Sequence, residues 1–166
     1  MNIIMEHHTY SNTSFFSLNN YNCWCRLVNV HDGDTITVII EYPTNTFCKY
    51  NIRLDGIDAA EMTSNNIEKK TKAIIARNLL IKLATCDDIY LNTLENIHIT
   101  RNQIIAMLEK KVYLVFLKCK NMDKYGRVLA DVYTSDNIDN TKSLNSMILD
   151  ANLAYEYHGG LKSEVP

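Results

Sequence analysis

The sequence predicts one α+β domain built around a small closed β-barrel. Residues 26–30, 35–40, 46–57, 112–117 and 128–134 have the alternating or β-branched patterns that are typical of strands. A helix is expected between the third and fourth of these strands, and another after the fifth. Because so few strands would leave exposed edges in an open sheet, closure into a barrel is the economical arrangement.

Length and composition limit the classes of protein to consider. The 166 residues suffice for one domain with a proper core. Hydrophobic residues make up 46% and charged residues 22%, as in ordinary soluble globular proteins. The formal net charge of −2 argues against a general nucleic-acid coat protein, but it does not exclude an enzyme that grips one phosphate locally.

The cysteines indicate a reducing compartment, because their number is odd and their spacing matches no disulfide framework. They are Cys23, Cys25, Cys48, Cys86 and Cys119. A zinc site at Cys23 and Cys25 would need a second pair, so we read both as small residues at the start of the first strand. No signal peptide or transmembrane run is recognised. We therefore expect an intracellular, monomeric protein with no membrane partner.

The ends and the connections divide the chain further. Residues 1–20 are polar and are expected to form a disordered tail, residues 21–160 the domain, and residues 161–166 a short tail without an assigned role. Thr63 or Ser64 is expected to cap a helix that ends near residue 84. The expected core face of that helix is Ile67, Ile74, Ile75, Leu79 and Leu83.

The segment 85–110 is the least regular part of the sequence. Residues 88–91 and 97–100 could pair as a small hairpin, and residues 103–110 have a helical pattern. Residues 143–152 also read as a helix, with apolar side chains on one face.

The stretch from residue 52 to 61 combines an apolar strand with several charged side chains. Arg53, Asp55, Asp58 and Glu61 fall within ten residues. A solvated strand end explains this stretch about as well as a functional site does, since a single motif is only a hypothesis. Two further stretches favour a site, namely Asp32-Gly33-Asp34-Thr35 and Asp123-Lys124-Tyr125-Gly126-Arg127. Acids and arginines together suit a hard cation that faces a phosphate.

These three motifs, in this order, resemble those of the staphylococcal nuclease family, and the resemblance covers about residues 27–160. It implies a five-stranded OB-fold barrel with three helices. It also implies a calcium-dependent nuclease that hydrolyses DNA or RNA with little base preference and leaves 3′-phosphate ends.

The resemblance also assigns roles to single residues. Asp34 and Asp58 look like carboxylate ligands of Ca²⁺, and the backbone carbonyl of Ala59 looks like a third ligand. Glu61 resembles the acid that orients or deprotonates the attacking water.

The basic residues of the motifs match the substrate. Arg53 and Arg127 resemble a clamp on the scissile phosphate, which stabilises the extra charge of the pentacoordinate state. Lys124 and Tyr125 resemble contacts to a neighbouring phosphate.

Three departures from the family pattern and one alternative function remain. Ala60 stands where the family often has proline, the connection 85–110 is longer than in compact members, and the final tail is short.

The alternative is a catalytically silent module that binds nucleic acid or a protein partner. Such a module is expected to have lost at least one residue of the catalytic set, and none is missing here.

Overall fold

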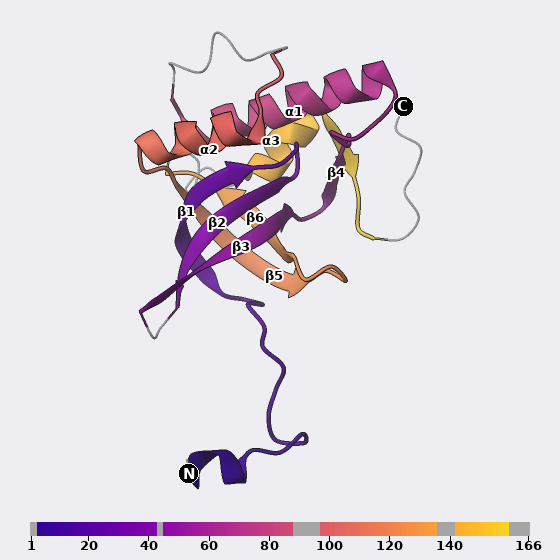
Figure 1. Cartoon of the computed structure of the whole chain (residues 1–166). Helices are drawn as coiled ribbons and strands as arrows, with labels where there is room; N and C mark the ends of the chain where they lie inside the picture. The colour runs from indigo at the N-terminus through magenta and orange to yellow at the C-terminus, as the bar shows by residue number, and fades with distance from the viewer. Residues whose placement is uncertain (1–2, 43–44, 88–96, 136–141, 160–166) are drawn as a thin grey trace.

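The computed structural model describes residues 3–42, 45–87, 97–135 and 142–159, and its centre is a closed five-stranded barrel (Figure 1). The strands are β1 (Asn22–Val30), β2 (Thr35–Tyr42), β3 (Thr46–Leu54), β5 (Leu114–Met122) and β6 (Val128–Tyr133). They follow the order β1-β2-β3-β6-β5, and β5 pairs back with β1. Only the pair β3–β6 is parallel among these neighbours. The predicted α+β fold with a closed barrel is confirmed, and it is consistent with an OB-fold-like barrel.

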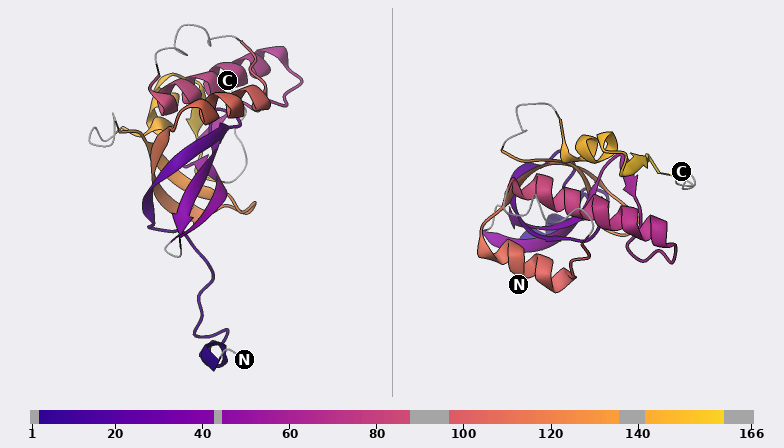
Figure 2. Two further views of the ribbon diagram at one scale, coloured as in Figure 1. Left: turned by 60° about the vertical axis from the view of Figure 1, so that its left-hand side comes forward. Right: turned by 90° about the horizontal axis from the view of Figure 1, so that it is seen from above.

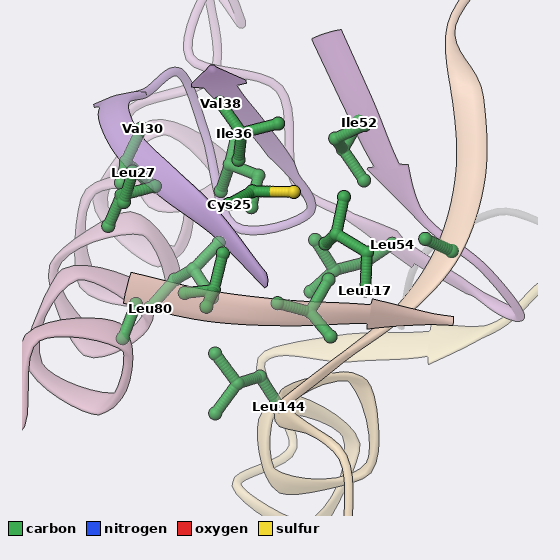
Figure 3. Close-up of a cluster of buried hydrophobic side chains, with 14 of the residues drawn as sticks. Cys25, Leu27, Val30, Ile36, Val38, Ile52, Leu54, Leu80, Leu117 and Leu144 are labelled. Atoms are coloured by element: carbon green, nitrogen blue, oxygen red, sulfur yellow. The ribbon is translucent and has the colours of Figure 1, made fainter. Parts of the chain in front are cut away.

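Aliphatic side chains from every strand fill the barrel (Figure 3). The alternation of the strands directs them inward, as the period of two requires. Leu27, Ile36, Ile52 and Leu117 are completely buried there. This core fixes the register of the strands, because a slip by one residue would turn each of these side chains toward solvent.

The predicted third strand, residues 46–57, is divided into two strands. β3 ends at Leu54, and Gly56 adopts a positive φ of 78°, a conformation that glycine tolerates without steric cost. The chain then enters β4 (Ile57–Ala59), which leaves the barrel and pairs with β7 (Ala154–Glu156). This turn places Asp58 and Ala59 beside one end of the barrel.

Helix α1 (Ile67–Thr85) crosses one end of the barrel, and α2 (Arg101–Lys110) lies beside it (Figure 2). The cap of α1 is Asn66, whose side chain accepts a hydrogen bond from the Lys69 backbone at 3.1 Å, and not Thr63 or Ser64 as predicted. α2 begins two residues before the predicted start, because Thr100 and Gln103 form a capping box.

The buried face of α1 differs from the predicted one. Ile67 is 84% exposed, and Ile74 and Ile75 are only partly buried. The buried face carries Ala73, Ala76, Arg77, Asn78, Leu80, Ile81, Ala84 and Thr85.

Two polar side chains on this face each donate a hydrogen bond to a nearby backbone carbonyl. Arg77 donates to the carbonyl of Ile99 at 2.7 Å, and Asn78 donates to that of Ile97 at 3.0 Å. Residues 97–100 therefore run along α1 and form no strand, while residues 88–91 of the predicted hairpin lie outside the described residues.

Helix α3 (Leu144–Asp150) is joined to the barrel by one buried amide. Asn145 donates to the carbonyls of Asp55 and Ala130, at 2.9 and 3.0 Å, and accepts from the Val132 amide at 3.1 Å. These bonds connect the end of β3 to β6 at the point where the chain turns into β4. They fix the backbone that carries Asp58.

The N-terminal residues lead away from the barrel (Figure 1). A short 3-10 helix, η1 (Ile3–His7), precedes exposed residues, and contact with the barrel begins at Leu18, which is 5% exposed. The Asn20 amide donates to the carbonyl of Cys119 at 3.0 Å. Residues 18–20, which the sequence places in the tail, thus contact the core.

None of the helices in the described part of the chain is both long enough and apolar enough to cross a membrane.

Candidate active site

All eight residues that the sequence selects line one pocket of about 660 Å³ beside the end of β3. They come from the loop before β2, from β3, from β4 and the residues after it, and from the turn between β5 and β6. They are Asp34, Arg53, Asp58, Ala59, Glu61, Lys124, Tyr125 and Arg127. The three sequence motifs therefore meet at one place.

Arg53 forms the buried centre of this site. Its Nη1 atom lies 2.5 Å from Oδ2 of Asp34, and its Nη2 atom donates to Oδ1 of Asp58 at 2.6 Å. All three residues are less than a tenth exposed. The Nη1 contact is an ion pair without hydrogen-bond alignment, so this nitrogen is buried without a hydrogen-bond partner in the described residues.

Asp34 is held by backbone and side-chain donors. Oδ2 accepts from the Ala59 amide at 2.6 Å, and Oδ1 accepts from the Thr35 hydroxyl at 2.9 Å. Burial and the negative charge of Asp32 raise the pKa of Asp34 to about 7, against the opposing charge of Arg53. A further positive charge in the pocket would stabilise the ionised carboxylate.

Gly33 allows the loop that carries Asp34 to lie close to two elements. A Cβ atom at this position would lie 2.6 Å from Cβ of Ala76 and 2.8 Å from Cβ of Ala59. Neither distance is sterically possible without movement of α1 or β4. Packing therefore requires the glycine of Asp32-Gly33-Asp34, in addition to any chemical role of the two acids.

Asp58 is oriented by the pairing of β4 with β7. It lies opposite Tyr155 in this ladder, and the Tyr155 hydroxyl donates to Oδ2 of Asp58. With Arg53 on Oδ1, both oxygens of this carboxylate face donors from the protein.

Asp123 organises the turn that presents Arg127. Its Oδ1 atom accepts from the amides of Tyr125 and Arg127, each at 2.9 Å, and Oδ2 accepts from Nε of Arg127 at 2.6 Å. Burial acts to raise the pKa of Asp123, but these hydrogen bonds outweigh it and lower that pKa. Because the contact uses Nε, the two terminal nitrogens of Arg127 remain for another acceptor.

Lys124 and Tyr125 stand at the rim. Tyr125 is 72% exposed, with the ammonium of Lys124 at 5.0 Å and the guanidinium carbon of Arg127 at 5.5 Å from its ring centroid. Such contacts of cations with an aromatic ring hold both basic groups beside the exposed ring. Glu61 is exposed at the same pocket, just after β4.

A second pocket, of about 520 Å³, adjoins the first. The two share Arg53, Lys124, Tyr125, Arg127 and Tyr157. The second continues past Gly56 and His158. A ligand longer than one phosphate group could therefore extend from one pocket into the other.

Sequence reasoning assigned no role to four residues that shape this site. Asn51 and Tyr157 line the pocket, Tyr155 binds Asp58, and Asp123 orients Arg127. An acid at the head of a glycine-containing turn is a readable signal for Asp123. Nothing local identifies the tyrosines, because their place depends on the pairing of β7 with β4.

The donor set fits a hard cation in its chemistry. Asp34 and Asp58 supply carboxylate oxygens at one wall, beside Ala59, and oxygen ligands are those that Ca²⁺ prefers. In the described residues, Arg53 lies between the two carboxylates, and no preassembled group of three or more His, Cys, Asp or Glu residues is found.

No protein-family model matches this sequence, and no curated protein matches it.

Proposed function

We propose that this protein is a calcium-dependent nuclease of the staphylococcal nuclease type, which hydrolyses phosphodiester bonds of DNA or RNA. The observation that carries the proposal is the convergence of the eight selected residues on one pocket. Two arginines and a lysine at that pocket match a phosphodiester, while the acids match a divalent cation and an attacking water.

The two arginines would act on the charge of the phosphate. Arg53 contributes the positive charge of a guanidinium group that lines the pocket, and Arg127 contributes its terminal nitrogens. Both groups are held before substrate binds, by Asp34 and Asp58 in one case and Asp123 in the other. Donors fixed in advance favour the transition state, because no reorganisation is needed when charge develops.

The acids would bind the cation and activate the attacking water. Asp34, Asp58 and the carbonyl of Ala59 would hold Ca²⁺, which supplies charge neutralisation and Lewis acidity at the phosphate. Glu61 would orient the attacking water or accept its proton. Attack that expels the 5′ oxygen leaves 3′-phosphate and 5′-hydroxyl ends.

The rim residues would extend the contact along the strand. Lys124 and Tyr125 reach a neighbouring phosphate or sugar, and these contacts carry no information about the base. Little sequence preference is therefore expected.

One observation favours a second candidate, a silent module that binds nucleic acid or a protein. Every carboxylate oxygen of Asp34 and Asp58 accepts a donor from the protein, or is paired with Arg53. Such a set could be retained for the stability of the barrel end alone.

The decisive experiment incubates the full chain with labelled single-stranded and duplex DNA and RNA. Each substrate is tested with Ca²⁺, with Mg²⁺ and with excess chelator, beside the Glu61→Gln variant as the matched control. Cleavage that needs Ca²⁺, gives 3′-phosphate ends and fails in the variant supports the proposal. Binding without cleavage under all conditions would establish the silent module, and full activity in chelator would exclude calcium dependence.

A further inference from the structure

Three thiols meet inside the barrel, on a side of β1 and β5 that the pocket does not use. Cys23 and Cys25 lie two residues apart on β1, so their side chains share one face, and their sulfur atoms are 3.3 Å apart. Cys119 lies on the neighbouring strand β5, and its proximity to Cys23 affects the pKa of that thiol.

The three side chains differ in exposure. Cys25 and Cys119 are buried, and Figure 3 shows Cys25 among the aliphatic side chains of the core. Cys23 is only partly buried. Packing alone explains the two buried thiols, since free cysteine behaves as a small hydrophobic residue. It does not explain a partly exposed thiol whose sulfur lies 3.3 Å from a buried one.

The contacts make Cys23 the acidic member of the group. Hydrogen bonds from Cys119 and Cys25 lower the pKa of the Cys23 thiol to about 4, although partial burial opposes this. The same hydrogen bonds, together with burial, raise the pKa values of Cys25 and Cys119. Cys23 is therefore the member of the cluster that most favours the thiolate form, and the thiolate is the nucleophile of cysteine chemistry.

We propose that Cys23 is a peroxide-reactive thiol and that Cys25 resolves it, so that the pair forms a reversible disulfide within β1. The proposal does not depend on nuclease activity. It rests on the 3.3 Å contact of the sulfurs and on the difference in exposure between the two residues.

The reaction proceeds in two balanced steps. The Cys23 thiolate attacks one oxygen of hydrogen peroxide, the O–O bond breaks, and hydroxide leaves as Cys23 becomes a sulfenic acid. The Cys25 sulfur then attacks the Cys23 sulfur, the S–O bond breaks, and water leaves with the proton of Cys25. The two cysteines lose two electrons, and the peroxide is reduced to one water and one hydroxide, which takes a proton from the solvent to become the second water.

The strand must tighten locally when the bond forms. The sulfurs move from 3.3 Å to bonding distance, about 2.05 Å. Trp24, the chain's single tryptophan, lies between the two cysteines, is 45% exposed, and packs edge-on against Phe116 with ring centroids 5.3 Å apart. Its fluorescence should therefore report oxidation directly.

The test treats the full chain with one equivalent of hydrogen peroxide in a Cys86→Ser background, which removes the exposed thiol. Tryptic digestion followed by cleavage after Trp24 should give two fragments joined by the Cys23–Cys25 bond. Trypsin cuts after Lys118 and Lys120, so a bond to Cys119 would instead link a separate peptide. Dithiothreitol should restore the original Trp24 emission.

Three variants separate the roles. Cys25→Ser should accumulate a Cys23 sulfenic acid that dimedone traps, Cys23→Ser should show neither product, and Cys119→Ser should still form the Cys23–Cys25 bond. In the unoxidised chain, alkylation of Cys23 should change less than about 2-fold between pH 6 and 8, whereas an ordinary thiol of pKa about 8.5 changes more than about 50-fold. A bond to Cys119, or equal oxidation of wild type and Cys23→Ser, would overturn the proposal.

Discussion

Asp123 accepts a hydrogen bond from Nε of Arg127 at 2.6 Å and a second from its backbone amide at 2.9 Å. The acid therefore fixes both the main chain and the guanidinium group of one arginine. In the motif Asp123-Lys124-Tyr125-Gly126-Arg127, the first residue therefore positions the last.

The first prediction concerns this positioning. Asp123→Ala should lower kcat by about 10-fold or more, because Arg127 keeps its charge but loses its orientation. Steady-state cleavage of single-stranded DNA measures the effect. Asp123→Asn, which keeps an acceptor oxygen, should recover part of the loss. Normal turnover in Asp123→Ala would show that Arg127 needs no positioning.

The two arginines should respond differently to the same substitution. Arg53→Lys and Arg127→Lys should each lower kcat by about 100-fold, since lysine lacks the planar fork. Only Arg53→Lys should also lower the melting temperature clearly, because the Arg53 side chain is 9% exposed and pairs with two buried acids, whereas the Arg127 side chain is 31% exposed. Turnover and thermal unfolding are measured together on both variants. An Arg127→Lys variant that unfolds as readily as Arg53→Lys would mark Arg127 as structural.

The barrel could be predicted from the sequence because each of its strands has a recognisable local pattern. Alternation and β-branched residues identify the strands locally, and closure follows from the need to satisfy their edges. The break at Gly56 and the pairing of β4 with β7 could not be predicted, since a three-residue strand carries too little pattern.

The buried face of helix α1 could not be predicted from the sequence. Its isoleucines suggested the buried face, but the structure buries Arg77 and Asn78, whose partners are carbonyls of residues 97 and 99. No rule of periodicity can anticipate this, because the partners are more than fifteen residues distant in sequence. The residues of the candidate site could be selected from the sequence because they occur in short motifs, whereas the positions of Tyr155 and Asn145 depend on tertiary pairing.

A third prediction tests the close approach at Gly33. Gly33→Ala should destabilise the fold by about 1–3 kcal/mol, because the added methyl overlaps Ala76 and Ala59. Ca²⁺ affinity should fall as well, since Asp34 is the next residue. Adding Ala76→Gly removes one of the two clashes, so the double variant should recover part of the stability. Urea unfolding of the four proteins gives the coupling, and strict additivity would contradict the steric explanation.

The fourth prediction concerns the cation. When Asp34 is ionised, the three acids Asp34, Asp58 and Glu61 with the two arginines contribute a net charge of −1, which Ca²⁺ would change to +1. Ca²⁺ and a non-hydrolysable nucleotide phosphate should therefore each strengthen the binding of the other by the same factor. Calorimetric titration of each ligand, with and without the other, measures this factor. Asp34→Ala should weaken Ca²⁺ binding first, while Glu61→Gln should leave Ca²⁺ binding nearly unchanged and lower turnover. Independent binding of the two ligands would show that the acids do not hold the cation.

The last prediction locates the true start of the folded unit. The sequence suggests that residues 1–20 are dispensable, but Leu18 is 5% exposed within the core, and Asn20 donates to the carbonyl of Cys119. A chain that begins at Ser17 should keep its melting temperature and its activity, because Phe15, Phe16 and the residues before them contribute little buried area. A chain that begins at Tyr21 should lose about 2 kcal/mol or more of stability, the scale of one buried leucine.

Leu18→Ala in the full chain is the matched control, since it removes the side chain but leaves the backbone contacts of residue 20. It should reproduce most of the loss, because burial of the leucine side chain, and not the length of the tail, provides the stabilisation. Equal melting temperatures for the chains that begin at residues 17 and 21 would show that Leu18 does not contribute to the core in solution.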